Sequence, residues 1–278
     1  MTAAVFPNFQ KKEAIQAAKS VCSILHKLNV DIISDKKIAD TASIMPANDA
    51  IRACDTVIVI GGDGTILDYS VCAAENSKPL LGINVGRIGF MATLETDELD
   101  KLEKLVNGEY TVEKRIMIDG VIVRDEKHFV GYTALNDIYI SAQFSSLVDF
   151  KVAINGYTVS SIRSDGIIFS TPTGSTAYSL SAGGPIAEPS LDCIEMTPVC
   201  PQSLSSRTIL FSPEHSLVTE YRSRDISVDL TVDGRIRERL SPGDKVIIAK
   251  SEKVLSLIDI DGFSFYDSVN RKLMRSIK

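Results

Sequence analysis

Two hydrophobic periodicities divide the chain. Up to about residue 110, apolar residues either recur at helical spacing or gather in short uninterrupted runs, and the two kinds alternate. The helical stretches are 11–28, 66–74 and 96–106, and the runs typical of buried strands are 30–33, 55–60 and 79–84. Alternating strands and helices indicate a doubly wound, mostly parallel sheet. We therefore expect an α/β N-terminal domain over residues 1–113.

Beyond residue 110 the pattern changes to short alternating or apolar runs separated by turn signals such as Asn155-Gly156 and Asp233-Gly234. The runs are 116–124, 128–140, 148–154, 157–162, 166–170, 207–211, 225–232, 245–250 and 254–259. They predict a β-rich, β-sandwich-like C-terminal domain over 114–262. The final stretch, 266–277, is again amphipathic and predicts a helix, and we expect 263–278 to return to the first domain.

Length and composition limit the classes of function. A chain of 278 residues is long for one core and suggests two domains, and its net charge of −6 argues against general nucleic-acid binding. The five cysteines form no CxxC pair, which indicates reduced thiols. No signal-peptide pattern and no apolar run of membrane-spanning length occur, so we expect a cytoplasmic protein without a membrane partner.

A glycine loop follows the strand run 55–60 and precedes a helix. Its residues are Gly61, Gly62, Asp63, Gly64 and Thr65. A strand, a glycine turn and a helix place backbone N–H groups and the positive end of a helix against a phosphate. An aspartate in such a loop is repelled by phosphates unless a metal ion or a proton-transfer role accounts for it. We therefore expect chemistry at this loop.

Three further features each carry a functional and a structural interpretation. The run 171–185, rich in Ser, Thr and Gly and called the hydroxyl run below, suits a nucleoside or forms a helix cap without a ligand. The adjacent pair Asn136-Asp137, inside an apolar run, binds a ligand or forms a β-bulge. Five arginines are either a basic patch or, more simply, a solvated strand face; they are Arg222, Arg224, Arg235, Arg237 and Arg239.

Several familiar signatures are absent, among them GxxxxGK[ST], the kinase HRD and DFG motifs and G-x-S-x-G. The histidines His26, His128 and His215 lie far apart, without metal-ligand spacing. In contrast, the glycine loop, the Asn136-Asp137 pair, the hydroxyl run and the stretch 197–207 together resemble the NAD kinase family. The glycine loop alone is shared with lipid kinases and 6-phosphofructokinases, whereas the hydroxyl run is much more specific.

The resemblance implies an activity and a site. NAD kinases transfer a phosphoryl group from ATP, or in some members polyphosphate, to the 2′-hydroxyl of the adenosine ribose of NAD. The family's catalytic base matches Asp63, and the donor-phosphate loop matches Gly61, Gly62, Gly64 and Thr65, with Mg²⁺ as the implied metal and its protein ligands unknown. The implied NAD contacts are Asp63, Gly64, Asn136, Asp137, Arg163, Asp165, Thr176, Ala177, Tyr178, Ser181 and Arg235.

The family's roles are divided among these positions. Asn136 and the backbone of 176–178 correspond to adenine contacts, Asp137 to a ribose contact and Asp165 to the nicotinamide end. Asp137 stands where many members have glutamate, Arg235 where glutamine is common and Gln202 where histidine is common, which leaves the roles of the last two open. The resemblance further implies an NAD site between domains, often completed by a neighbouring subunit, and hence a homodimer or homotetramer.

Two other functions share part of this pattern. A lipid kinase of the same superfamily shares the glycine loop but not the hydroxyl run. A catalytically silent NAD(P)-binding regulator keeps the nucleotide contacts and can lack the base, and the presence of Asp63 argues against it. The sequence leaves open the choice of ATP or polyphosphate, the preference for NAD or NADH, feedback regulation and the number of subunits.

Overall fold

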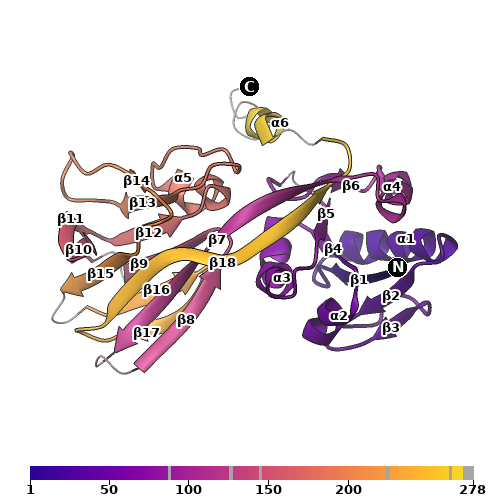
Figure 1. The fold of residues 1–278 in the computed structure, drawn as a ribbon, viewed down its shortest axis with the longest axis horizontal. Helices are drawn as coiled ribbons and strands as arrows, with labels where there is room; N and C mark the ends of the chain where they lie inside the picture. The colour runs from indigo at the N-terminus through magenta and orange to yellow at the C-terminus, as the bar shows by residue number, and fades with distance from the viewer. Residues whose placement is uncertain (87–88, 125–127, 144–145, 223–225, 263–264, 272–278) are drawn as a thin grey trace. The chain divides into compact units, whose positions relative to one another are not determined.

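The computed structural model describes residues 1–86, 89–124, 128–143, 146–222, 226–262 and 265–271 (Figure 1). Two compact units are present: unit 1 is Met1–Arg115 with Lys253–Lys278, and unit 2 is Ile116–Glu252. The first boundary lies two residues after the expected position at 113, and the chain rejoins unit 1 ten residues before 263. Both differences arise because the long strands β7 (Thr111–Arg124) and β18 (Lys245–Asp259) run through the boundaries.

Unit 1 is built on a parallel sheet with the strand order β3-β2-β1-β4-β5. This confirms the predicted doubly wound α/β domain. Its elements are β1 (Thr2–Pro7), α1 (Lys12–Lys27), β2 (Asp31–Ser34), β3 (Ala42–Ile44), α2 (Ala47–Ala53), β4 (Thr56–Gly61), α3 (Asp63–Glu75), β5 (Leu80–Asn84), β6 (Leu94–Glu95), the 3₁₀ helix η1 (Leu99–Lys101), α4 (Leu102–Asn107) and α6 (Phe265–Val269).

Successive strand residues point to opposite sides of the sheet. Because the strands are apolar on both sides, helices cover both faces. On one face, Ala3 and Val5 of β1 pack in a cluster with the apolar side of α1. On the other, Phe6 stacks on Tyr69 of α3 with ring centroids 4.3 Å apart. Burial on both faces explains why the strands read as uninterrupted apolar runs.

Several parts of unit 1 differ from the prediction. Strands β1, β3 and β6 and helix α2 were not predicted. The helix expected at 96–106 begins only at Leu99 and becomes α-helical at Leu102. Its N-cap residue is Glu98, whose carboxylate accepts the backbone N–H of Glu95 at 3.0 Å. The C-terminal helix α6 ends at Val269, and 272–278 lie outside the described residues.

Unit 2 is β-rich, as predicted, and its strands pair antiparallel. One sheet has the order β14-β13-β12-β9-β16-β17; a second set pairs β11-β10-β15-β18, and β7 pairs with β18 and β8. Its remaining elements are β8 (His128–Ala134), β9 (Asp137–Ala142), β10 (Val148–Ile154), β11 (Tyr157–Ser164), β12 (Gly166–Ser170), η2 (Thr173–Thr176), α5 (Tyr178–Ser181), β13 (Ile194–Val199), β14 (Ile209–Phe211), β15 (Leu217–Arg222), β16 (Val228–Val232) and β17 (Arg235–Leu240).

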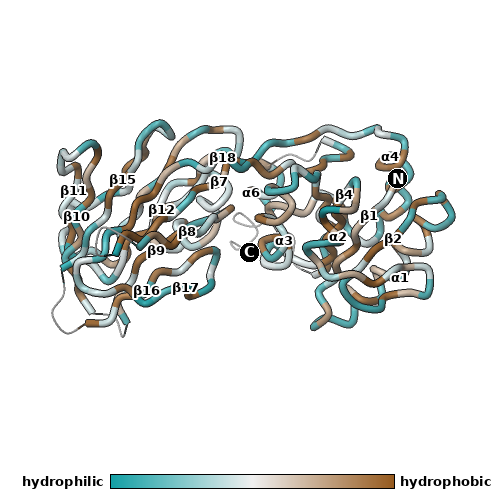
Figure 2. Tube along the Cα trace, turned by 60° about the horizontal axis from the view of Figure 1, so that its bottom comes forward, coloured by the Kyte–Doolittle hydropathy of each residue, from teal (hydrophilic) through white to brown (hydrophobic). Residues whose placement is uncertain are grey.

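The core of unit 2 draws on both sets of strands, for example Ile140 and Phe169 from the first and Phe150 and Val152 from the second. Figure 2 shows hydrophobic colour along β9 and β12, which lie in the middle of the six-stranded sheet. Apolar residues of two sheets packed on one another make a sandwich core.

Strand limits in unit 2 differ from the predicted runs. The run 128–140 is two strands, β8 and β9, separated at Leu135 and Asn136. The two runs after 245 form the single strand β18. Strands β13, β15 and β17 were not predicted as runs; β13 contains a proline and buries successive residues, so it lacks a simple alternation. Among the described residues, no helix is long and apolar enough to cross a lipid bilayer.

Candidate functional site

The glycine loop is the end of a strand joined to the first turn of a helix. Strand β4 ends at Gly61, Gly62 is the N-cap, and α3 begins at Asp63. The helix therefore starts three residues earlier than residue 66, where the apolar spacing placed it. Asp63 lies in the first turn, where the positive end of the helix dipole favours a negative charge. This removes much of the apparent conflict of an acid in this segment.

The three glycines of this segment have different surroundings. A Cβ on Gly61 would lie 2.5 Å from the hydroxyl oxygen of Thr65, so this glycine is required by packing. A Cβ on Gly62 or Gly64 would meet no heavy atom within 4 Å. Packing within the unit therefore does not account for Gly62 and Gly64, and their backbone is open to close approach by a ligand.

Backbone N–H groups orient the Asp63 carboxylate. The N–H of Phe90 donates to its two oxygens at 3.1 and 2.9 Å, and the N–H of Met91 donates to Oδ1 at 3.2 Å. A Cβ on Gly89 would lie 2.0 Å from Oδ1, so only glycine allows this approach. The segment 89–91, which follows β5, thus orients the acid of the glycine loop.

This segment occupies the point where the direction of the sheet reverses. Strand β1 connects to β2 on one side and β4 connects to β5 on the other, so the carboxyl ends of β1 and β4 form the topological switch point. Asn8, which follows β1, donates from Nδ2 to Thr65 Oγ1 at 3.2 Å, and its backbone N–H donates to Ile60 O. Ligands of open α/β sheets bind at such a point.

In unit 2, Asn136 and Asp137 occupy a corner between strands. Asn136 lies in the two-residue connection between β8 and β9, and Asp137 begins β9, so the pair is not a bulge within one strand. The carboxylate of Asp233 accepts three successive backbone N–H groups, from Leu135 at 3.0 Å, Asn136 at 2.8 Å and Asp137 at 3.2 Å. The Asp233-Gly234 turn was predicted, but this role of its side chain was not.

Two side chains of this corner are buried, and one of them has a polar atom without a partner. Asn136 is 9% exposed, and its Oδ1 has no hydrogen-bond partner among the described residues. Burial raises the pKa of Asp137 to about 7, and the neighbouring Asp233 charge adds to the shift. Burial also raises the pKa of Asp233, opposed by the three backbone N–H groups. Buried polar atoms without partners are expected where a ligand supplies them.

The hydroxyl run divides into a buried half and an accessible half. Ser170, just before it, and Thr171 and Ser175 within it are buried and bond to backbone oxygens: Thr171 Oγ1 donates to Leu135 O at 2.6 Å, and Ser175 Oγ donates to Pro172 O at 2.7 Å. These hydroxyls are structural. The four residues of the run that the resemblance singles out are all accessible or half-buried: Thr176, Ala177, Tyr178 and Ser181.

Tyr178 marks where the predicted contacts of unit 2 gather. Its ring meets Tyr139 edge-on at 4.9 Å. Its pKa is raised by burial and by the nearby Tyr139, Cys200, Asp137 and Asp165. Asp137 and Asp165 thus lie close to Tyr178, and the structure brings the β9 corner, the β11–β12 bend and α5 together.

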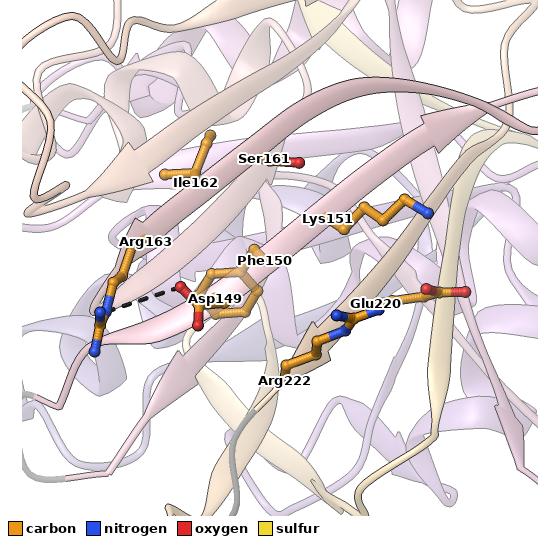
Figure 3. Close-up of a pocket in the computed structure, with 8 residues that line it drawn as sticks. All are labelled: Asp149, Phe150, Lys151, Ser161, Ile162, Arg163, Glu220 and Arg222. Carbon is orange, nitrogen blue, oxygen red and sulfur yellow. Dashed lines mark ion pairs between the residues drawn. The ribbon is translucent and has the colours of Figure 1, made fainter.

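The predicted contact Arg163 lines an open cavity of about 400 Å³ on strands β10, β11 and β15. Figure 3 shows its guanidinium beside Asp149, with 3.8 Å between Nε and Oδ1. Lys151, Glu220 and Arg222 line the same cavity. Its polar, exposed wall differs from the buried corner around Asp137.

Most of the arginine cluster has the structure of an exposed strand face. Arg235, Arg237 and Arg239 lie exposed on β17, at the edge of its sheet, and Arg239 Nε is 3.5 Å from Asp229 Oδ1. Arg224 lies outside the described residues. Arg235 directly follows the Asp233-Gly234 turn, which places it next to the Asn136–Asp137 corner.

Sequence reasoning missed four residues around these sites: Asn8, Gly89, Tyr139 and Asp233 in the role described above. The glycines at 86 and 89 were visible as a turn, but nothing local connects them with Asp63. Among the described residues, no group of three or more His, Cys, Asp or Glu side chains is placed to hold a metal ion. A metal that enters with phosphates needs only one or two protein carboxylates.

Family models match both halves of the chain. Residues 4–110 match the ATP-NAD kinase N-terminal domain and residues 135–260 the ATP-NAD kinase C-terminal domain. A protein named NAD kinase from Natranaerobius thermophilus is 34% identical over 275 residues, covering 97% of this chain and 96% of that protein. An NAD kinase from Symbiobacterium thermophilum is 38% identical over 230 residues, 82% of this chain and 81% of its own length.

Two solved structures share the fold. Yeast NADH kinase, crystallised with NADH, has a TM-score of 0.89 at 22% identity, covering 100% of this chain and 88% of the yeast chain. An NAD kinase from Archaeoglobus fulgidus, in complex with ATP, has a TM-score of 0.76 at 24% identity and full coverage of both chains. At these identities the likeness concerns the fold.

Proposed function

This chain belongs to the ATP-NAD kinase family, and from that premise we propose that it transfers the terminal phosphoryl group of ATP to the 2′-hydroxyl of the adenosine ribose of NAD, giving NADP. The observation that carries this proposal is the match of both family domains together with near-complete coverage by NAD kinases at 34% identity. A lipid kinase would share only the glycine loop. Here the family match also covers the C-terminal domain, including the hydroxyl run, and this favours an NAD kinase.

Asp63 is proposed as the general base. A base must lie within hydrogen-bond reach of the proton that it removes and must be oriented before the reaction. Two backbone N–H donors hold this carboxylate in place in the first turn of α3. In the reaction, the 2′-oxygen attacks the terminal phosphorus, its proton passes to Asp63, and the bond from phosphorus to the bridging oxygen of the nucleoside diphosphate breaks.

The open backbone at Gly62 and Gly64 is proposed to receive the donor phosphates. Both positions lack side chains and have free space where a Cβ would stand. The N-terminus of α3 adds a positive potential there. Mg²⁺ is proposed as the counter-ion of these phosphates, where it would neutralise the charge that repels the incoming hydroxyl. The carboxylate of Asp63 lies in the same segment.

Dinucleotide recognition is proposed for the accessible residues of unit 2. Asn136 offers a buried amide oxygen without a partner, which fits the amino group of adenine. Asp137 fits ribose hydroxyls, because a carboxyl group can both donate and accept when its pKa is about 7. Thr176, Ala177, Tyr178 and Ser181 supply backbone and hydroxyl groups, while Gly64, Arg163, Asp165 and Arg235 remain proposed contacts from the family pattern.

The decisive experiment is a donor-by-acceptor matrix with the purified protein. ATP or polyphosphate is combined with NAD or NADH in the presence of Mg²⁺, and NADP(H) is measured with an NADP-specific dehydrogenase. We expect NADP from ATP and NAD. Absence of product with every combination would contradict the kinase, whereas dinucleotide binding without turnover would favour a regulator.

We also propose a cytoplasmic homodimer or homotetramer. All five cysteines are unpaired, as in a reducing compartment. Large apolar side chains are exposed on unit 2, including Leu204 at 90% and Leu210 at 52%. Exposed apolar surface of this kind is common at subunit interfaces. Sedimentation of the purified protein tests the assembly, and a monomer at micromolar concentration would contradict it.

A further inference from the structure

A buried glutamate lies behind the turn that carries Tyr178. Glu195 is on β13, opposite Ser170 of β12 and Leu210 of β14, and it is fully buried. A buried carboxyl in a strand interior is costly unless other groups satisfy it. No proposed step of phosphoryl transfer uses this residue.

Hydroxyl groups surround Glu195. Ser179 Oγ donates to its Oε1, and Thr197 Oγ1 donates to the same oxygen at 3.0 Å. Ser179 and Thr197 are 2.8 Å apart, and Thr197 is 3.0 Å from the hydroxyl of Thr208. Three hydroxyl side chains and one carboxyl therefore form a connected buried network, and such networks restrict the elements that they join.

Gly184, near the end of the hydroxyl run, packs directly against this network. A Cβ on Gly184 would lie 2.3 Å from Glu195 Oε1 and 2.4 Å from Ser179 Oγ. The N–H of Gly184 donates to Ser179 O at 2.9 Å. Gly184 thus packs against the Ser179 hydroxyl, which is hydrogen-bonded to Glu195.

Glu195 is suited to act as a neutral acid. Burial raises its pKa, and among the described residues only the Ser179 and Thr197 hydroxyls oppose that shift. Its second oxygen, Oε2, is buried and has no partner in the described part of the chain. A carboxylate with one bare oxygen and no cation is much less favourable than the protonated acid.

We propose that Glu195 is a positioning residue for dinucleotide binding, holding Ser179 through its neutral carboxyl group and thereby orienting the Tyr178–Ser181 turn. This rests on the proposed function, because it assumes that the turn contacts NAD. Ser179 faces the network while its neighbours Tyr178 and Ser181 are exposed, so an anchor on Ser179 sets the direction of both. Glu195 acts from behind and touches no substrate.

The test compares Glu195→Leu with Glu195→Gln. Leucine removes the acceptor and leaves two buried hydroxyls without it, whereas the amide of glutamine keeps an oxygen for Ser179 and Thr197 without charge. For Glu195→Leu we expect KM and Kd for NAD to rise about tenfold, with kcat and KM for ATP within about threefold of wild type. Glu195→Gln should restore both constants to within about twofold.

Two further variants separate positioning from general destabilisation. Val152→Ala creates a cavity in the core of unit 2, away from the network, and should lower Tm without raising Kd for NAD. Ser179→Ala removes the other end of the hydrogen bond, is expected to raise Kd in the same way, and carries the test if Glu195→Leu does not fold. Combined with Glu195→Leu it should add little.

The outcomes distinguish this inference from the proposed function. If wild type neither binds nor phosphorylates NAD, the proposed function fails. If wild type is active and Glu195→Leu or Ser179→Ala binds NAD with unchanged affinity, only the positioning role is overturned. A rise in Kd of equal size in Val152→Ala would likewise overturn it, as would failure of Glu195→Gln to restore binding.

Discussion

At the scale of single residues, three carboxyl groups have different tasks set by their surroundings. Asp63 accepts backbone N–H groups at a helix N-terminus, Asp137 is buried beside a second acid, and Glu195 is buried among hydroxyls. Burial opposes the charge of the last two and raises their pKa. The same chemical group therefore serves as a base, a ligand contact and a neutral anchor in our proposals.

Asp63→Asn should keep dinucleotide binding and lose turnover. The amide preserves size and one acceptor oxygen for the N–H groups of Phe90 and Met91, but it cannot accept the ribose proton. General-base catalysis contributes roughly 10²- to 10⁴-fold, so kcat should fall by that order. Steady-state kinetics and calorimetric NAD binding measure the two effects, and normal turnover would exclude Asp63 as the base.

The raised pKa of Asp137 should make the stability of the folded protein depend on pH. Its pKa is about 7 in the folded protein against an ordinary 3.8, so the folded state holds the proton more strongly than the unfolded state. The resulting stabilisation is complete below about pH 4 and is lost as pH rises to about 7. The contribution of Asp137 should therefore lower the Tm of the wild-type protein as the pH rises from about 4 to about 7.

Asp137→Asn removes that contribution, so its Tm should decline less and should exceed the wild-type Tm at pH 8. Glu188→Gln, which changes an exposed carboxyl, is the matched control and should keep the wild-type slope. Thermal unfolding from pH 4 to 8 makes the comparison. Parallel curves for Asp137→Asn and wild type would contradict the assignment.

At the scale of elements, short segments are held by backbone contacts from distant parts of the chain. The hydroxyl run folds onto the β8–β9 corner: the N–H of Thr171 donates to Asn136 O at 2.9 Å, and Gly174 packs on the same backbone. Asp233 holds the other side of that corner. The corner that presents Asn136 and Asp137 is thus clamped between two loops.

Gly174→Ala should break this clamp. A Cβ would lie 2.0 Å from Asn136 O and 2.4 Å from its carbonyl carbon, and backbone atoms cannot yield as a flexible side chain can. We expect a loss of about 1–3 kcal/mol in the free energy of unfolding, together with weaker NAD binding. Gly131→Ala on β8, whose nearest neighbour is 3.9 Å away, should change stability by less than about 0.5 kcal/mol.

Denaturant unfolding and NAD titration of both glycine variants measure these effects. Equal stability of Gly174→Ala and wild type would show that the 174–136 contact can relax.

At the scale of the whole molecule, each unit offers one part of the proposed chemistry. Unit 1 holds Asp63 and the open glycines at a topological switch point, and unit 2 holds the Asn136–Tyr178 cluster. Neither part alone explains a kinase. The match of both family domains within one chain connects them.

Metal removal tests the complete enzyme. EDTA in excess should abolish NADP formation, and Mg²⁺ should restore it, because the donor phosphates need a counter-ion during transfer. NAD binding measured without ATP should be nearly unaffected by EDTA. Retention of activity after thorough metal removal would contradict this part of the proposal.

The sequence by itself determined the architecture of both units and the candidate segments, because periodicity, glycine turns and motifs are local properties. It indicated the parallel sheet, the β-rich second unit, the glycine loop and the hydroxyl run. Element limits differ from the sequence pattern in places: the helix at Asp63 begins earlier than its apolar spacing, and β13 buries successive residues instead of alternating.

Only the tertiary structure decided how these segments are held. Asp233 accepts the N–H of Leu135 across 98 positions, the Phe90 N–H reaches Asp63 across 27, and Glu195 meets Ser179 across 16. Hydrogen bonds between such distant positions follow from packing and leave no periodic trace in the chain. The tertiary structure likewise separated the buried, structural hydroxyls of the 171–185 run from those left accessible to a ligand.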